Sequence, residues 1–236
     1  MISHKYKCIF IHIPKCAGSS IQKYFHPYVG LNWKEPNYDI LYGWCPKRKI
    51  HLQHATSKIL LETELISEEN WKNYFKFTIV RNPWDRAYSD YFWIQKERNI
   101  NGSFSDYIQG QGPFYDIFNL IDVKEYRGDH LNLQTDFFDF EGLYKLDAIL
   151  KFESLNSDMS KLVDKLNFDK KFRIHENKSP LKKKLHYSKF YTDDYRSMVE
   201  HKYMRDIKQL GYVYENRISL KSRISDFFSG LISTTA

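Results

Sequence analysis

The sequence predicts an α/β fold in which helices flank a central parallel sheet. Two short stretches rich in β-branched and aromatic residues, 5–13 and 75–80, each lead through a turn into a segment with helical spacing. A third apolar stretch, 147–152, is again followed by helical spacing. Because strands that alternate with helices favour parallel pairing, we expect a three-layer sandwich.

The composition indicates one folded domain. Of 236 residues, 42% are hydrophobic and 17% aromatic, which excludes an intrinsically disordered chain. The longest apolar runs fall far short of the roughly 18 residues that a membrane span needs. The first residues lack the cleavage site of a secretory signal, and three cysteines without paired spacing indicate neither a disulfide framework nor a structural zinc site. We therefore expect a cytoplasmic protein.

The net charge points to an anionic ligand without identifying it. Lysine and arginine number 36 against 29 acidic residues, which gives +7 with histidine neutral. Such a surface attracts anions electrostatically. Nucleic acid, a nucleotide and an acidic glycan all remain open at this point.

The first half of the chain repeats a strand, turn and helix. Strand 5–13 ends at Pro14, and a helix that a serine can cap is expected over 20–25. Proline, glycine and scattered aromatic residues predict a loop over 32–49, and helical spacing resumes over 51–65. After strand 75–80, the next helix, 84–98, is expected to have Asn82 as its N-cap and Pro83 in its first turn.

The second half predicts an irregular segment between regular elements. Recurring glycines make 99–142 poor in core residues and suggest a lid or a substrate-facing insertion. Helices are expected over 159–166 and over 193–210, the latter ended by Gly211. In the tail, apolar residues over 220–231 share one helical face. We favour packing of this face on the chain or on a partner over peripheral contact with a membrane.

The turn after the first strand has the features of a phosphate-binding loop of the P-loop type. Backbone amides at a strand-to-helix turn converge on an anion, and Lys15 adds a mobile positive charge. The lysine precedes Gly18 here, so the turn is not a Walker A motif. Cys16 is unsuited to a thiolate phosphatase, because Gln22 stands where that chemistry needs arginine. The candidate loop comprises Pro14, Lys15, Cys16, Ala17, Gly18, Ser19 and Ser20.

The turn after the second long strand holds a second candidate anion site. Arg81 follows strand 75–80 and precedes a helix, where a guanidinium and free amides can share one phosphate. Ser89 lies two turns into that helix. As an alternative, Arg81 or Arg86 could form an ion pair with Asp85 or Asp90 that braces the helix. If both turns bind anions, the ligand carries two separated phosphates.

The two turns together resemble a known family. FIHIPKCAGSSI and FKFTIVRNPWDRAYSDYF are similar to the two nucleotide-binding signatures of the family 2 sulfotransferases, which include carbohydrate sulfotransferases related to heparan sulfate 2-O-sulfotransferase and bacterial relatives. LKFESL and the stretch 175–212 resemble later signatures of that family. The resemblance suggests a sulfotransferase domain over 1–214, with 99–142 its weakest part, and leaves the tail 215–236 uncovered.

The resemblance implies a nucleotide donor, 3′-phosphoadenosine 5′-phosphosulfate (PAPS), and a saccharide acceptor. The loop from Pro14 to Ser20 would hold the 5′-phosphosulfate, and Arg81 and Ser89 the 3′-phosphate. Sulfuryl transfer needs a base for the acceptor proton and a cation for the departing phosphate. Lys15 is the expected cation. The family places a histidine between the two signatures, which favours His54 as the base, with His51 as an accessory residue or the rival.

Two other functions compete with the one that this resemblance implies. A P-loop kinase or nucleotidase would want Ser or Thr directly after the lysine, and Cys16 stands there. A nucleic-acid binder would use Lys47–Lys49 and Lys182–Lys184 as a basic patch, but nearby acids balance most cations.

The other histidines are assigned no catalytic role. His12 on the first strand is expected to be structural, and His175 and His186 to flank a solvated basic run. His51 and His54 could bind a metal, but no third ligand at suitable spacing is evident. We therefore expect no metal.

Overall fold

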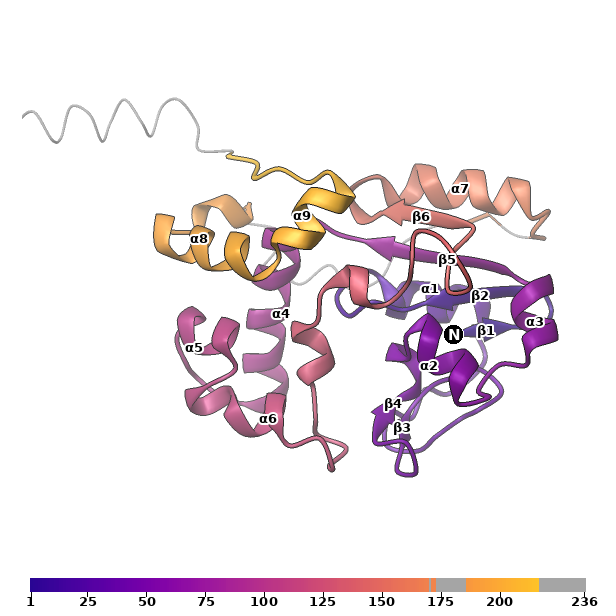
Figure 1. Cartoon of the computed structure of the whole chain (residues 1–236), viewed down its shortest axis with the longest axis horizontal. Helices are drawn as coiled ribbons and strands as arrows, with labels where there is room; N and C mark the ends of the chain where they lie inside the picture. Colours follow the sequence, from indigo (N-terminus) through magenta and orange to yellow (C-terminus); the bar gives the residue numbers. More distant parts are fainter. Residues whose placement is uncertain (170, 173–185, 217–236) are drawn as a thin grey trace, which may run out of the picture.

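The computed structural model describes residues 1–169, 171–172 and 186–216 (Figure 1). Its main sheet has the order β1-β2-β5-β6. The strands are β1 (Ile2–Ser3), β2 (Cys8–Ile11), β5 (Phe75–Val80) and β6 (Ala148–Lys151). Strands β2, β5 and β6 pair in parallel, whereas β1 pairs antiparallel with β2. The expected α/β fold with a central, mostly parallel sheet is confirmed; the two-residue β1 was not predicted.

Helices and short turns connect these strands. The α-helices are α1 (Gly18–Phe25), α2 (Ser57–Glu62), α3 (Glu68–Asn73), α4 (Pro83–Arg98), α5 (Phe104–Gln109), α6 (Tyr115–Asn119), α7 (Leu155–Lys165), α8 (Asp193–Lys202) and α9 (Met204–Leu210). A small hairpin, β3 (Trp44–Cys45) and β4 (Ile50–His51), interrupts and follows the expected loop. Single turns of 3₁₀ helix are η1 (Leu52–His54), η2 (Gly112–Phe114), η3 (Gly128–Leu131), η4 (Gln134–Asp136), η5 (Phe152–Ser154) and η7 (Tyr187–Lys189).

The apolar residues form two clusters. One surrounds the sheet, with β2 fully buried and residues of α1 and α7 packed against it. The other lies among α4, α5 and α8, which Figure 1 shows grouped to one side of the sheet. Phe104, Tyr107 and Phe114 are almost completely buried there. The expectation that 99–142 is poor in core residues is therefore wrong, because its aromatic side chains outweigh its glycines.

The helix ends agree with the local signals only in part. Asn82 caps α4 through its side chain and Pro83 is its first residue, as predicted. Helix α1 starts earlier than predicted, at Gly18, after Ala17 in a left-handed conformation without a side-chain cap. The single helix expected over 193–210 is broken at Tyr203, whose side chain is buried in the second cluster.

Several expectations concern residues that are not described. The tail helix over 220–231, His175 and the basic run Lys182–Lys184 all lie outside the described residues. Among the helices that are described, none is both long and apolar enough to cross a membrane.

Candidate active site

The loop between β2 and α1 presents backbone amides at a helix start. Lys15 and Ala17 adopt left-handed conformations, with φ of 67° and 65°. Within the described part of the chain, the amides of Ala17, Gly18 and Ser19 donate to no backbone carbonyl. Amides left unpaired at a helix N-terminus are suited to an anion. The loop thus has unpaired amides of the kind that bind an anion, and its role in binding the donor stays a prediction.

Two buried arginines donate hydrogen bonds to backbone carbonyls of this loop. Arg81 Nη1 donates to the Lys15 carbonyl at 2.9 Å, and Arg86 Nε donates to the Pro14 carbonyl at 3.2 Å. Arg86 also donates to the carbonyls of His130 and Asn132, at 2.8 and 3.0 Å. Arg86 therefore ties the loop to the segment that follows α6.

Cys16 is a buried thiol within this loop. Its Sγ lies 3.6 Å from the Pro14 carbonyl and from Gln134 Oε1. Burial raises the pKa of the Cys16 thiol to about 12. The protonated thiol agrees with the prediction that Cys16 is not a nucleophile.

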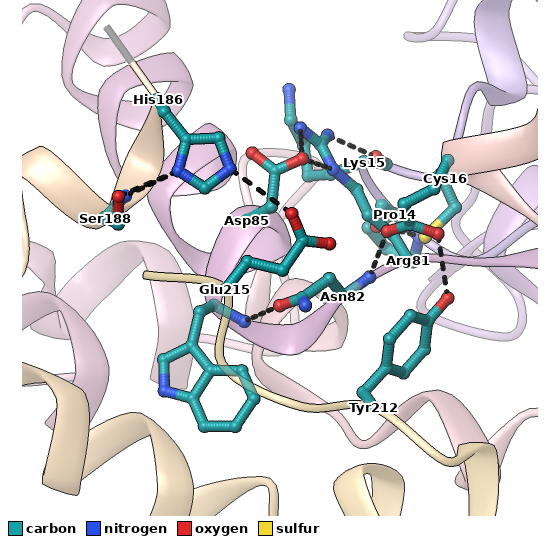
Figure 2. A network of polar contacts seen from close by, with 12 residues as sticks. Pro14, Lys15, Cys16, Arg81, Asn82, Asp85, His186, Ser188, Tyr212 and Glu215 are labelled. Atoms are coloured by element: carbon teal, nitrogen blue, oxygen red, sulfur yellow. Dashed lines mark hydrogen bonds and ion pairs between the residues drawn. The ribbon is translucent and has the colours of Figure 1, made fainter. Parts of the chain in front are cut away.

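Arg81 forms the ion pair that the sequence left open. Its side chain is 2% exposed, and its Nε donates to Asp85 Oδ2 at 2.8 Å (Figure 2). Its guanidinium also lies 4.2 Å from the centre of the Phe152 ring. Ser89 is half-buried one turn after Asp85. A 3′-phosphate at Arg81 would share the guanidinium with Asp85, so that assignment stays a prediction.

The segment after α9 crosses the end of β5. Glu153 accepts hydrogen bonds from the Asn82 amide at 2.7 Å and from the Tyr212 hydroxyl at 3.1 Å. Asn82 Nδ2 donates to the Val213 carbonyl at 3.0 Å. Figure 2 shows Asn82 and Tyr212 beside Arg81 and the loop. The expected 3′ site thus lies next to the C-terminal part of the described chain.

His54 lies at the centre of a histidine cluster. It ends η1, and its Nδ1 is hydrogen bonded to Asp129 Oδ2. The His54 ring meets the His12 ring edge-on at 4.9 Å between centroids, and the His130 ring at 5.4 Å. Three imidazoles and a carboxylate from distant parts of the sequence therefore meet at one place.

Lys15 reaches the same cluster through Trp93. The Trp93 ring stacks on His130 at 5.1 Å between centroids, and Lys15 Nζ lies 4.5 Å from the centre of the Trp93 ring. His130 Nδ1 is in turn 2.6 Å from Asp90 Oδ1. Two intervening rings, Trp93 and His130, thus connect the expected cation with the expected base.

Electrostatics keep His54 suited to accept a proton. Burial lowers the pKa of His54, and the facing Asp129 carboxylate offsets part of this effect. Burial alone would raise the pKa of Asp129, but His54 lowers it below its usual range. Burial would also raise the pKa of Asp90, but the contact with His130 and the charges of Lys15 and Arg86 together lower it. A neutral imidazole oriented by a carboxylate is the arrangement of a general base.

His51 lies beside His54, with 6.2 Å between the ring centroids, but it has other polar partners. Its Nε2 lies 2.6 Å from Arg127 Nη1 and 3.0 Å from the Lys124 carbonyl. Burial, reinforced by the Arg127 charge, lowers the pKa of His51 to about 3. These contacts favour the accessory role of His51 over that of the rival base.

Sequence reasoning missed several members of the cluster. Asp129 and His130 lie in the segment expected to be a lid, and Asp90 and Trp93 share one face of α4 without a sequence signal for chemistry. His12, expected to be structural, packs where a Cβ on residue 18 would lie 1.6 Å from its Nε2. The His12 ring therefore leaves no room for a side chain at Gly18, and the same ring contacts His54.

A comparison with protein families identifies the family of this chain. A model of the sulfotransferase family matches residues 1–215. No match is found among curated proteins or among solved structures. Because the match covers nearly the whole chain, including the loop, Arg81 and the histidine cluster, this chain belongs to the sulfotransferase family, whose members transfer a sulfuryl group from a nucleotide sulfate donor to an acceptor.

Proposed function

We propose that this protein transfers the sulfuryl group of PAPS to a hydroxyl group of a saccharide, with His54 as the general base. The observation that carries the proposal is the chain of contacts from Lys15, in the loop, through Trp93 and His130 to the His54 and Asp129 pair. The saccharide class follows from the resemblance to carbohydrate sulfotransferases and is the part to be tested with acceptors.

The donor binds across the ends of β2 and β5. The amides of Ala17, Gly18 and Ser19 receive the 5′-phosphosulfate, while Pro14, Cys16 and Ser20 complete the loop around it. Lys15 neutralises the charge that builds on the departing phosphate. Arg81 and Ser89 take the 3′-phosphate, with Asp85 holding the guanidinium in place.

His54 removes the acceptor proton as the new bond forms. The acceptor oxygen attacks sulfur, the bond between sulfur and the phosphate oxygen breaks, and the acceptor proton passes to the imidazole. Asp129 orients the ring and stabilises the imidazolium that results. All these steps use only the chain's own residues and the donor, in keeping with the expectation that no metal is required.

Nucleotide titration and a transfer assay test this function. The purified protein should bind 3′-phosphoadenosine 5′-phosphate far more tightly than ATP, and radiolabelled PAPS should label a saccharide acceptor. Preference for ATP with a magnesium requirement would instead establish a kinase. Salt-sensitive binding of nucleic acid, without affinity for 3′-phosphoadenosine 5′-phosphate, would instead establish a nucleic-acid-binding protein.

A further inference from the structure

The histidine cluster contains a set of ligands that the function proposed above does not use as a set. One nitrogen or oxygen atom each from His54, Asp129 and His130 lies within 4.8 Å of the other two. His54 comes from η1, and the adjacent residues Asp129 and His130 come from η3. Two imidazoles and one carboxylate form a donor set that binds zinc and related divalent cations in proteins.

The surroundings of His130 are those of a metal ligand. Its Nδ1 is 2.6 Å from Asp90 Oδ1, and Asp90 Oδ2 accepts the Tyr107 hydroxyl at 3.0 Å. Asp90 is 1% exposed, so this carboxylate is fixed beneath the ring. A metal-binding histidine nearly always donates its second ring N–H to such a partner, which leaves the other nitrogen for the cation. His130 therefore has its supporting contacts in place.

Asp129 provides an independent observation that points to a missing cation. Its Oδ2 is hydrogen bonded to His54, whereas its Oδ1 is buried without a hydrogen-bond partner among the described residues. A buried carboxylate oxygen without a partner is costly, because it has lost its water and gained no donor. A cation beside Asp129 would supply the missing interaction.

We infer that His54, Asp129 and His130 form a binding site for a divalent cation of the zinc class, and that the bound cation inhibits sulfuryl transfer. Zinc and cobalt fit better than magnesium or calcium, because two of the three ligands are nitrogen atoms. Three protein ligands leave a coordination position for water. The inhibition rests on the proposed function: a coordinated His54 cannot also keep its pairing with Asp129 and accept the acceptor proton.

Cobalt spectroscopy tests the site without any substrate. Co²⁺ is titrated into the chelator-treated full chain, and its visible absorption bands are followed. We expect one equivalent to give the intense bands of a site with four or five ligands, and Zn²⁺ to abolish them. The conservative variants His130→Gln and Asp129→Asn should each weaken Co²⁺ binding by about tenfold or more. The matched control is His201→Ala, since His201 is exposed on α8.

Each outcome bears on the inference. Cobalt bands of wild-type intensity in both variants, or no bands in the wild type at micromolar metal, would overturn it. If a variant misfolds, the thermal midpoint of the wild type must still rise with Zn²⁺ at constant protein concentration, as ligand linkage requires. Inhibition by Zn²⁺ that a chelator reverses completes the test. Cobalt binding without affinity for 3′-phosphoadenosine 5′-phosphate would retain the site and remove the proposed function, so the two failures are distinguishable.

Discussion

His54 and Asp129 are hydrogen bonded although 75 positions separate them in the sequence. The contact joins the turn before α2 to the turn after α6. Because Asp129 accepts from His54 Nδ1 in this pairing, the other ring nitrogen is left to receive a proton. The pair therefore gives His54 the tautomer and the orientation that a general base requires.

The first prediction concerns His54 itself. His54→Ala should lower the turnover number by about a hundredfold or more, in line with general-base contributions. The affinity for 3′-phosphoadenosine 5′-phosphate should stay unchanged, because no donor contact is assigned to this ring. Single-turnover kinetics and nucleotide titration measure the two quantities separately, with His201→Ala as the control. An equal loss of donor affinity would remove His54 from the base role.

The second prediction concerns Gly18, which packs against the His12 ring. A Cβ on residue 18 would lie 1.6 Å from His12 Nε2, so Gly18→Ala must displace the ring, which lies 4.9 Å from the His54 ring. We expect lower turnover and weaker donor binding, because the change acts on both the cluster and the loop. Gly30→Ala is the matched control, since a Cβ there meets nothing within 4 Å. Wild-type kinetics in Gly18→Ala would contradict the assigned geometry.

The third prediction separates the two phosphate sites. Ser89→Ala should weaken binding of 3′-phosphoadenosine 5′-phosphate more than that of adenosine 5′-phosphate, because only the former has a 3′-phosphate. Arg81→Ala is expected to act in the same direction, but Arg81 also holds the Lys15 carbonyl. Arg81→Lys is therefore the better companion variant, since it keeps a positive charge. If Ser89→Ala weakens both nucleotides alike, the 3′ site lies elsewhere.

Local signals predicted the parts of the site that adjoin the strands. The β-branched stretch 75–80, followed by Asn82 and Pro83, forms β5 and α4 as expected, because strand propensity and helix capping act between near neighbours. The loop after β2 was also placed correctly between a strand and a helix, but the serine cap expected there is wrong, because Ala17 in a left-handed conformation precedes α1. Arg81 was correctly placed at a strand end, and its alternative partner Asp85 was already recognised from the helical spacing.

The other half of the cluster depends on contacts that no periodicity reveals. Asp129 and His130 meet His54 only because the second hydrophobic cluster positions the segment after α6. The glycines of 99–142 suggested a loose segment, but burial of aromatic side chains such as Phe114 stabilises it. A third ligand for a metal was likewise invisible, because it comes from a distant part of the chain.

The fourth prediction concerns chelation. Treatment with a chelator should leave sulfuryl transfer intact or raise it, because the proposed steps need only Lys15, the loop amides and His54. Activity before and after chelation, and after addition of Mg²⁺, measures this. A loss of activity that Mg²⁺ restores would favour a kinase over the proposed sulfuryl transfer.

The fifth prediction concerns acid stability. His51 has a pKa of about 3 in the folded protein, lowered by burial and by Arg127, against 6.5 in the unfolded chain. Below about pH 6.5 the unfolded state therefore binds a proton that the folded state does not, so stability falls as the pH falls toward 3.

The His51→Gln variant, which cannot gain this proton, should lose less stability than the wild type between pH about 7.5 and about 5. Urea unfolding at the two pH values gives the comparison. His201→Ala, at an exposed position on α8, should keep the wild-type slope. If the unfolding free energy of His51→Gln changes with pH as much as that of the wild type, the loss of stability in acid comes from the other buried histidines, His12 and His54. Burial lowers their pKa values as well.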